Sequence, residues 1–274
     1  MTSKMTRDRQ TAQTARTKRA EQASPLARHF TLRSLLRFAA PSIGMMIIIS
    51  LYTVTDGIFI GRFAGSDALA ASNIVYPVIT LVLGLAIMLA SGGSALVAKN
   101  LGEGKTAAAR RRFTLITVTA IALASALAIL AVAAGDGLLF LLGASPELLA
   151  DCRSYLYALL PFFPFAALMI LFNAFFIADG RPMQGFRVSV LAGLTNAGLD
   201  YLFLAHLGLG VFGAGLATGI ADLLSAVIGL LYFWRSSRTL RFTKPQLEWR
   251  ALGQAMYNGS SELVTQLSVG ITTF

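Results

Sequence analysis

Apolar residues in this chain are grouped into six blocks, each about as long as a lipid bilayer requires. A helix rises about 1.5 Å per residue, so about 20 apolar residues cross the hydrocarbon core of a membrane. Each block therefore predicts a transmembrane helix, and a seventh helix is expected to begin near residue 251. The six blocks lie near residues 35–60, 68–98, 113–134, 154–178, 185–206 and 211–234.

Composition supports the same class, an all-α membrane protein. Hydrophobic residues make up 55% of the chain, charged residues only 13%, and the mean hydropathy is +0.67. About a quarter of a soluble domain would be charged. A single cysteine, Cys152, excludes an intrachain disulfide, and His29 and His206 match no metal-ligand spacing. No metal or organic cofactor is expected.

Positive charge is distributed unevenly between the two sides of the predicted bundle. Of the 23 lysines and arginines, all except Arg62 and Arg153 lie before or at the start of the first block, or in or beside alternate connections. The positive-inside rule places those regions, and the amino terminus, in the cytoplasm. The expected location is a plasma membrane or cell inner membrane, with several spans. This distribution explains the net charge of +10 without a nucleic-acid partner.

The chain divides into four expected regions. Residues 1–34 read as a disordered basic cytoplasmic tail, with a mitochondrial transit peptide as the weaker alternative. Residues 35–234 form a six-helix transmembrane lobe, 235–250 a basic cytoplasmic connection, and 251–274 the start of the seventh helix. A short helix along the outer membrane surface is expected within residues 136–151.

Two aspartates, Asp56 and Asp200, interrupt apolar blocks. A carboxylate at membrane depth costs about 2.5–3.5 kcal/mol on insertion scales, so it usually faces a cavity and binds a cation or proton. Asn196 and Thr218 fall at similar depth, about 6–15 Å from the outer ends of the helices at 1.5 Å per residue. Carboxylate, amide and hydroxyl oxygens suit a monovalent cation or a shuttled proton. The alternative is that each aspartate only hydrogen-bonds a neighbouring helix, and for Asp222 the two interpretations are equally open.

Small residues recur at helical spacing and predict close helix contacts. The pairs Gly57/Gly61, Gly61/Gly65 and Gly215/Gly219 are each four residues apart, so each pair lies on one helix face. Such spacing is typical of packed membrane helices.

Several motifs together resemble the multidrug and toxic-compound extrusion (MATE) transporters, and most closely their DinF-like branch. The resemblance extends over about residues 35–274 and includes the seventh helix. Its motifs are Pro41 followed by Asp56-Gly57-Ile58-Phe59-Ile60-Gly61-Arg62, then Lys99-Asn100-Leu101-Gly102-Glu103-Gly104-Lys105, Ala178-Asp179-Gly180-Arg181-Pro182, Asn196-Ala197-Gly198-Leu199-Asp200 and Gly213-Ala214-Gly215-Leu216-Ala217-Thr218.

The resemblance implies an antiporter, not an enzyme, built as two six-helix lobes around a central cavity. It implies export of drugs or other amphipathic organic compounds, and an amino-lobe site that binds a proton or sodium ion. Carried over by position, that site consists of Asp56 and Asp200, with Asn196 and Thr218 beside them.

Four further residues enter the expected site. Tyr155 and Asn173 are weaker carry-overs as cavity residues, because residue counting places Tyr155 near the outer rim and Asn173 near the cytoplasmic end. Asp222 is a candidate cavity residue on the same helix face as Thr218. Pro41 matches the family proline at which the first helix bends.

The expected partners are a small organic substrate, the lipid bilayer and a second six-helix lobe that this sequence lacks. The sequence is thus expected to be the amino-terminal half of a twelve-helix transporter plus part of the seventh helix. Three alternatives remain: a lipid-linked glycan flippase of the same superfamily, an intramembrane enzyme, and an inactive truncated fragment. A flippase would favour a cationic cavity for a diphosphate head, and no protease or metalloenzyme motif accompanies the paired aspartates.

Overall fold

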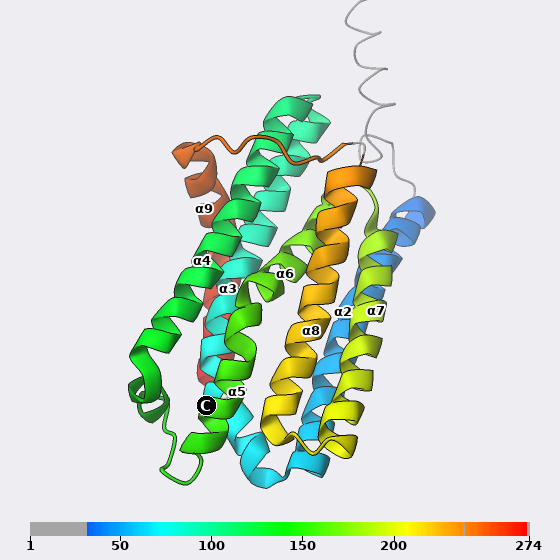
Figure 1. Ribbon diagram of the computed structural model, residues 1–274. Helices are drawn as coiled ribbons and strands as arrows, with labels where there is room; N and C mark the ends of the chain where they lie inside the picture. Colours follow the sequence, from blue (N-terminus) through cyan, green and yellow to red (C-terminus); the bar gives the residue numbers. More distant parts are fainter. Residues whose placement is uncertain (1–31, 238, 273–274) are drawn as a thin grey trace, which may run out of the picture.

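Six helical stretches long and apolar enough to cross a membrane run side by side in the computed structural model of the protein (Figure 1). The structure describes residues 32–237 and 239–272, so nearly all of the expected 1–34 tail lies outside the described residues. The all-α, six-span prediction is confirmed. The stretches are Ala39–Ala64, Ser66–Gly102, Thr106–Leu141, Leu149–Ala178, Pro182–His206 and Gly210–Ser236.

Eight α-helices are labelled in Figure 1, and short segments of other helical geometry extend four of them. The α-helices are α2 (Leu32–Phe59), α3 (Ser66–Gly102), α4 (Thr106–Leu141), α5 (Leu149–Leu159), α6 (Phe163–Ala178), α7 (Pro182–Asp200), α8 (Gly210–Leu231) and α9 (Trp249–Thr272). A 3-10 turn at Leu160–Phe162 joins α5 to α6. π-helical segments follow α2 at Ile60–Ala64, α7 at Tyr201–His206 and α8 at Tyr232–Ser236.

The two ends of the bundle differ in charge. We call the end that carries the connections 103–105, 179–181 and 237–248 the basic end, and it lies at the top of Figure 1. The opposite end, which holds the turns 142–148 and 207–209, is called the turn end. The charge pattern of the sequence predicts that the basic end faces the cytoplasm.

The expected short surface helix over 136–151 is only partly seen. Helical structure continues past a kink at Gly135, where φ is 54° and ψ is −139°, as far as Leu141. A turn follows, and α5 begins at Leu149. Gly135 permits the kink because a residue without a Cβ tolerates positive φ.

The fourth span is interrupted where two prolines lie close together. Pro161 lies in the 3-10 turn, and Pro164 lies in the first turn of α6, where its missing N–H leaves no helical hydrogen bond unmade. Phe162 and Phe163, at this interruption, line an internal cavity that is described below.

Close helix contacts form at some of the predicted glycines and not at others. A Cβ on Gly215 would lie 2.7 Å from the Ala158 Cβ, and a Cβ on Gly219 would lie 2.2 Å from Phe162 Cδ2. The packing prediction is therefore confirmed for this pair on α8. It is wrong for Gly57 and Gly65, where a Cβ would meet nothing within 4 Å.

At the basic end, aromatic rings pack against one another. Phe113 of α4 lies 4.8 Å from Phe175 and 5.0 Å from Phe233, measured between ring centroids. Phe172 and Phe176 also contact Phe233, at 5.3 and 5.2 Å. These contacts join α4, α6 and the end of α8 into one core.

Asp179, between α6 and α7, anchors the connection that leads to α9. Its carboxylate accepts hydrogen bonds from the Tyr232 hydroxyl at 2.7 Å, the Ser237 hydroxyl at 3.1 Å and the Leu240 N–H at 3.2 Å. Burial raises the pKa of Asp179, while these hydrogen bonds act in the opposite direction. Arg110 Nε adds a 2.8 Å bond to the Thr239 carbonyl, so the connection is fixed across the basic end (Figure 1).

Helix α9 packs tightly along α3. A Cβ on Gly92 would lie 1.9 Å from the Ala255 carbonyl oxygen, and one on Gly259 would lie 2.0 Å from the Met88 carbonyl oxygen. The two backbones therefore touch at paired glycines. Helix α9 is not one of the six spans identified by length and hydropathy among the described residues.

Candidate functional site

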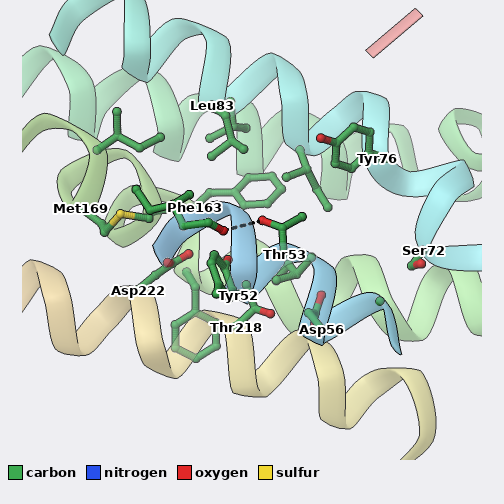
Figure 2. Close-up of a pocket in the computed structure, with 18 of the residues that line it drawn as sticks. Tyr52, Thr53, Asp56, Ser72, Tyr76, Leu83, Phe163, Met169, Thr218 and Asp222 are labelled. Carbon is green, nitrogen blue, oxygen red and sulfur yellow. Dashed lines mark hydrogen bonds between the residues drawn. The ribbon is translucent and has the colours of Figure 1, made fainter. Parts of the chain in front are cut away.

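A cavity of about 520 Å³ lies inside the bundle (Figure 2). Its wall is formed by residues from α2, α3, α5, α6, α8 and α9 and from the 3-10 turn. Figure 2 shows Tyr52 and Asp56 on α2 lying near Thr218 and Asp222 on α8. The cavity combines two carboxylates with tyrosine, phenylalanine and methionine side chains.

Asp56 and Asp200 are brought together, although they come from α2 and α7. Each carboxyl group is the principal charged neighbour of the other. Asp200 is fully buried, and neither of its carboxylate oxygens has a hydrogen-bond partner; Asp56 Oδ1 also lacks one. Asp56 lines the cavity, and Asp200 lies behind it. A buried carboxylate without a partner is costly, so this pair calls for a cation or a shared proton.

Asn196 and Thr218 lie beside this pair. Asn196 Nδ2 donates a 3.4 Å hydrogen bond to Thr218 Oγ1, which links α7 to α8. The Asn196 side chain is fully buried, and its Oδ1 has no partner. Asn196 and Asp200 lie on one face of α7, so the unpartnered amide oxygen and the carboxylate are adjacent along the helix.

The three further candidates all line the cavity. Tyr155 is buried on α5, and Asp222 is buried on α8. Asn173 of α6 is buried and donates a 3.5 Å contact to the Met169 sulfur. The depth count separated Tyr155 from Asn173 by nearly the whole membrane. Both residues nevertheless line the same cavity, which extends along the span they share.

Other polar residues of the wall were not singled out by the sequence. Tyr52, Ser72, Asn73, Tyr76 and Gln266 all line the cavity. Tyr52 is four residues before Asp56, so helical spacing from that aspartate could have identified it. Tyr76 is four residues after Ser72, which was itself not singled out, so spacing gave no signal for either of them. Gln266 could not have been found this way, because it depends on how α9 packs against α3.

Pro41 lies within α2, which is helical from Leu32 to Phe59. It is buried and lies roughly 22 Å along the helix from Asp56, at 1.5 Å per residue. A proline there leaves the carbonyl four residues earlier without its helical donor. Its expected role in bending therefore stays a prediction about movement between states.

The donor set suits a monovalent cation or a proton. Hard carboxylate, amide and hydroxyl oxygens converge at Asp56, Asp200, Asn196 and Thr218. Within the described residues, no group of three or more His, Cys, Asp or Glu side chains could hold a metal ion. The chemistry available here is reversible charge binding within a membrane bundle.

A multi-pass membrane bundle with acidic side chains beside an internal cavity is the arrangement expected of a membrane transporter. Comparison with known families is consistent with this class. The MatE family model matches residues 41–202, more than half of the chain, and the protein belongs to the MatE family.

Relatives and solved structures agree on the same family. Multidrug export protein MepA of Staphylococcus aureus is 25% identical over 224 residues, which cover 79% of this chain and 49% of MepA. An outward-facing structure of a multidrug resistance MATE family transporter of the MOP superfamily superposes with a TM-score of 0.79 and 24% identity, covering 86% of this chain and 53% of that one.

A MOP superfamily transporter from Pyrococcus furiosus, described as having a binding pocket of reverse polarity, superposes equally well. Its TM-score is 0.79 and its identity 23%, again over 86% of this chain and 53% of that chain. The chain thus spans about half the length of the relatives it matches. These relatives are transporters, and the intramembrane-enzyme alternative is set aside.

Proposed function

We propose that the protein carrying this chain is a cation-coupled antiporter that exports amphipathic organic compounds across the plasma membrane or cell inner membrane. The observation that carries the proposal is the Asp56/Asp200 pair. The buried Asp200 carboxyl group and the half-buried Asp56 carboxyl group come from different helices and lie together beside a cavity large enough for an organic molecule. The similarity to MepA, a multidrug export protein, supports the substrate class.

The pair couples transport if its cation affinity differs between two conformations. A ligand shifts a conformational equilibrium only by its differential affinity for the two states. Asp56 is on α2 and Asp200 is on α7, so any movement of α2 relative to α7 changes the distance between the carboxylates. Pro41 on α2 is the proposed place for that bend, and the second lobe is the proposed partner surface.

The cavity lining favours an organic cation or neutral amphiphile over an anionic head group. Asp56 and Asp222 are both in the wall, and no lysine or arginine occurs among the described residues that line it. Aromatic rings such as Tyr52, Tyr76 and Phe163 provide flat apolar faces that also attract cations. A lipid-linked glycan with a diphosphate head would meet like charge here, so we do not favour a flippase.

Transport by reconstituted vesicles tests the proposal. Vesicles that contain the complete protein are loaded with a fluorescent organic cation. Efflux from them is driven by a proton gradient in one experiment and by a Na⁺ gradient in another. We expect one of the gradients to drive efflux in the parent protein. Asp56→Asn and Asp200→Asn should each abolish the gradient dependence, whereas the exposed Asp67→Asn should retain it. Unchanged gradient-driven efflux in both site variants would refute the proposal.

The two experiments also decide which ion is coupled. Efflux driven only by the proton gradient assigns the pair to a proton, and efflux driven only by the Na⁺ gradient assigns it to sodium. The basic end is the proposed cytoplasmic side, so the driving ion should move from the turn end toward the basic end.

A further inference from the structure

Two buried serine hydroxyls near the cavity have no hydrogen-bond partner. Ser189 on α7 and Ser225 on α8 are 6% and 2% exposed, and neither Oγ is bonded. Several helical serines and threonines elsewhere in the bundle bond back to a carbonyl three or four residues earlier, as Ser50 does to Met46 at 3.0 Å and Thr117 does to Phe113 at 2.8 Å. An unbonded buried hydroxyl costs about 1–3 kcal/mol. A bound ligand that contacts these two hydroxyls would remove that cost.

The two serines face each other across the interface of α7 and α8. The Asn196–Thr218 hydrogen bond fixes the antiparallel register of these helices. Seven residues, about two turns, from that bond toward the basic end lead to Ser189 on one helix and Ser225 on the other. Asp222 lies between, four residues after Thr218 and three before Ser225, hence on the same face of α8.

Asp222, Ser189 and Ser225 line one small cavity of about 20 Å³. This volume accommodates a single water-sized particle. Ala192 and Gly193 on α7 leave the space open opposite Asp222. Tyr52 and Asp222 line both this small cavity and the large one, so the two spaces adjoin.

The small cavity carries uncompensated negative charge. Ion pairs in the described part of the chain join Lys105 to Glu103, Arg112 to Glu248 and Arg153 to Asp136, and none includes Asp222. The described residues lining this space include no lysine, arginine or histidine. A carboxylate with two free hydroxyl oxygens around a water-sized space is a ligand set for a small hard cation, whereas a proton alone would need only the carboxylate.

We propose that Asp222, Ser189 and Ser225 form a second cation site, one that binds Na⁺. It is separate from Asp56/Asp200, and its serines lie about two helical turns from the Asn196–Thr218 bond toward the basic end. It would hold the ion between the acid pair and the basic end of the lobe. This transport role rests on the proposed antiport function, whereas the binding of Na⁺ does not.

Equilibrium binding of radioactive Na⁺ to the complete purified protein in detergent tests this site. Four variants are compared with the parent: Asp222→Asn, the double variant Ser189→Ala/Ser225→Ala, Asp56→Asn, and Ser50→Ala. Ser50 is the matched serine control, because it is exposed on α2 and bonds to its own backbone. The measurement is made at mildly alkaline pH, where protons compete least with Na⁺.

We expect Asp222→Asn to lose one bound Na⁺ per protein. The double serine variant should bind that same Na⁺ ion with an affinity lower by about tenfold or more, a typical loss for an altered ion site. Asp56→Asn and Ser50→Ala should retain the Asp222-dependent ion. Unchanged Na⁺ binding in a folded Asp222→Asn variant would overturn the proposal. Unchanged Na⁺ binding in the double serine variant would also overturn it, and that result remains decisive if Asp222→Asn does not fold.

The outcome also separates this inference from the proposed function. If Asp56→Asn and Asp200→Asn left gradient-driven efflux intact while Asp222→Asn lost one Na⁺, the antiport proposal would fail and the second site would stand. If efflux depended on the acid pair and Asp222→Asn bound Na⁺ normally, the second site would fail alone.

Discussion

Asn196 Nδ2 on α7 donates a 3.4 Å hydrogen bond to Thr218 Oγ1 on α8, and this contact lies beside the Asp56/Asp200 pair. The other polar atom of this side chain, Asn196 Oδ1, is buried and has no hydrogen-bond partner. The bond therefore positions an amide oxygen that a bound cation can use, and Thr218 acts on the site through Asn196.

The first prediction concerns that positioning bond. Thr218→Val keeps the volume and removes the acceptor, so the concentration of coupling ion needed for half-maximal efflux should rise about tenfold or more. Thr218→Ser keeps the hydroxyl and should restore the parent value. Equal ion dependence in the valine and serine variants would show that the hydroxyl has no part in ion binding.

A second prediction concerns the contact of α3 with α9. In Gly92→Ala or Gly259→Ala, the new Cβ would overlap with the carbonyl oxygen of the facing helix. Overpacking of this kind costs about 1–3 kcal/mol. Both variants should unfold at lower temperature than the parent in a thermal scan in detergent.

The matched control for that contact lies on α9 itself. A Cβ on Gly253 meets nothing within 4 Å, so Gly253→Ala should be neutral or stabilising by up to about 1 kcal/mol through helix propensity. If all three alanine variants shifted the melting temperature alike, α9 would not pack on α3 as described.

A third prediction tests the anchor at Asp179. The Asp179 carboxylate accepts hydrogen bonds from Tyr232, Ser237 and Leu240. In Asp179→Asn, an NH₂ group replaces one of the two accepting oxygens, so a donor would face donors. We expect a loss of about 1–3 kcal/mol of stability, as for a buried polar group left unsatisfied. Limited proteolysis should then cleave within 237–248, and protection equal to the parent's would contradict the anchor.

A fourth prediction separates bending from binding. Pro41→Ala restores a helical N–H on α2 far from the acids, which should stiffen the helix without touching the ion ligands. Efflux should fall severalfold while equilibrium binding of the coupling ion stays at the parent level. Efflux at the parent rate would remove Pro41 from the mechanism.

Much of the fold could be predicted because its signal is local. Apolar blocks of bilayer length identified the six spans, and the alternation of basic connections indicated which loops share one end of the bundle. The helix break that lies at the cavity wall is harder to predict. The 3-10 turn at Leu160–Phe162 follows from neighbouring prolines, but its consequence, a wall shared by Tyr155 and Asn173, depends on packing with α8.

The candidate site was predictable only where a polar residue was anomalous in an apolar block. Asp56, Asp200 and Asp222 are such anomalies, and helical spacing from them reaches Tyr52, Asn196 and Thr218. Ser189 and Ser225 give no such signal, because serine is common in membrane helices and normally bonds to its own backbone. Only the structure shows that these two hydroxyls are unbonded and share a cavity with Asp222.

The most direct test of the central claim is a double-mutant cycle on gradient-driven efflux by the complete protein, with Asp56→Asn, Asp200→Asn and the two combined. Residues that hold one ion together act as a unit, so each single variant should lose the coupled rate and the double variant should lose no more. Additive losses, with the double variant slower than each single variant by the product of the two effects, would mean that the carboxylates act independently and do not share an ion.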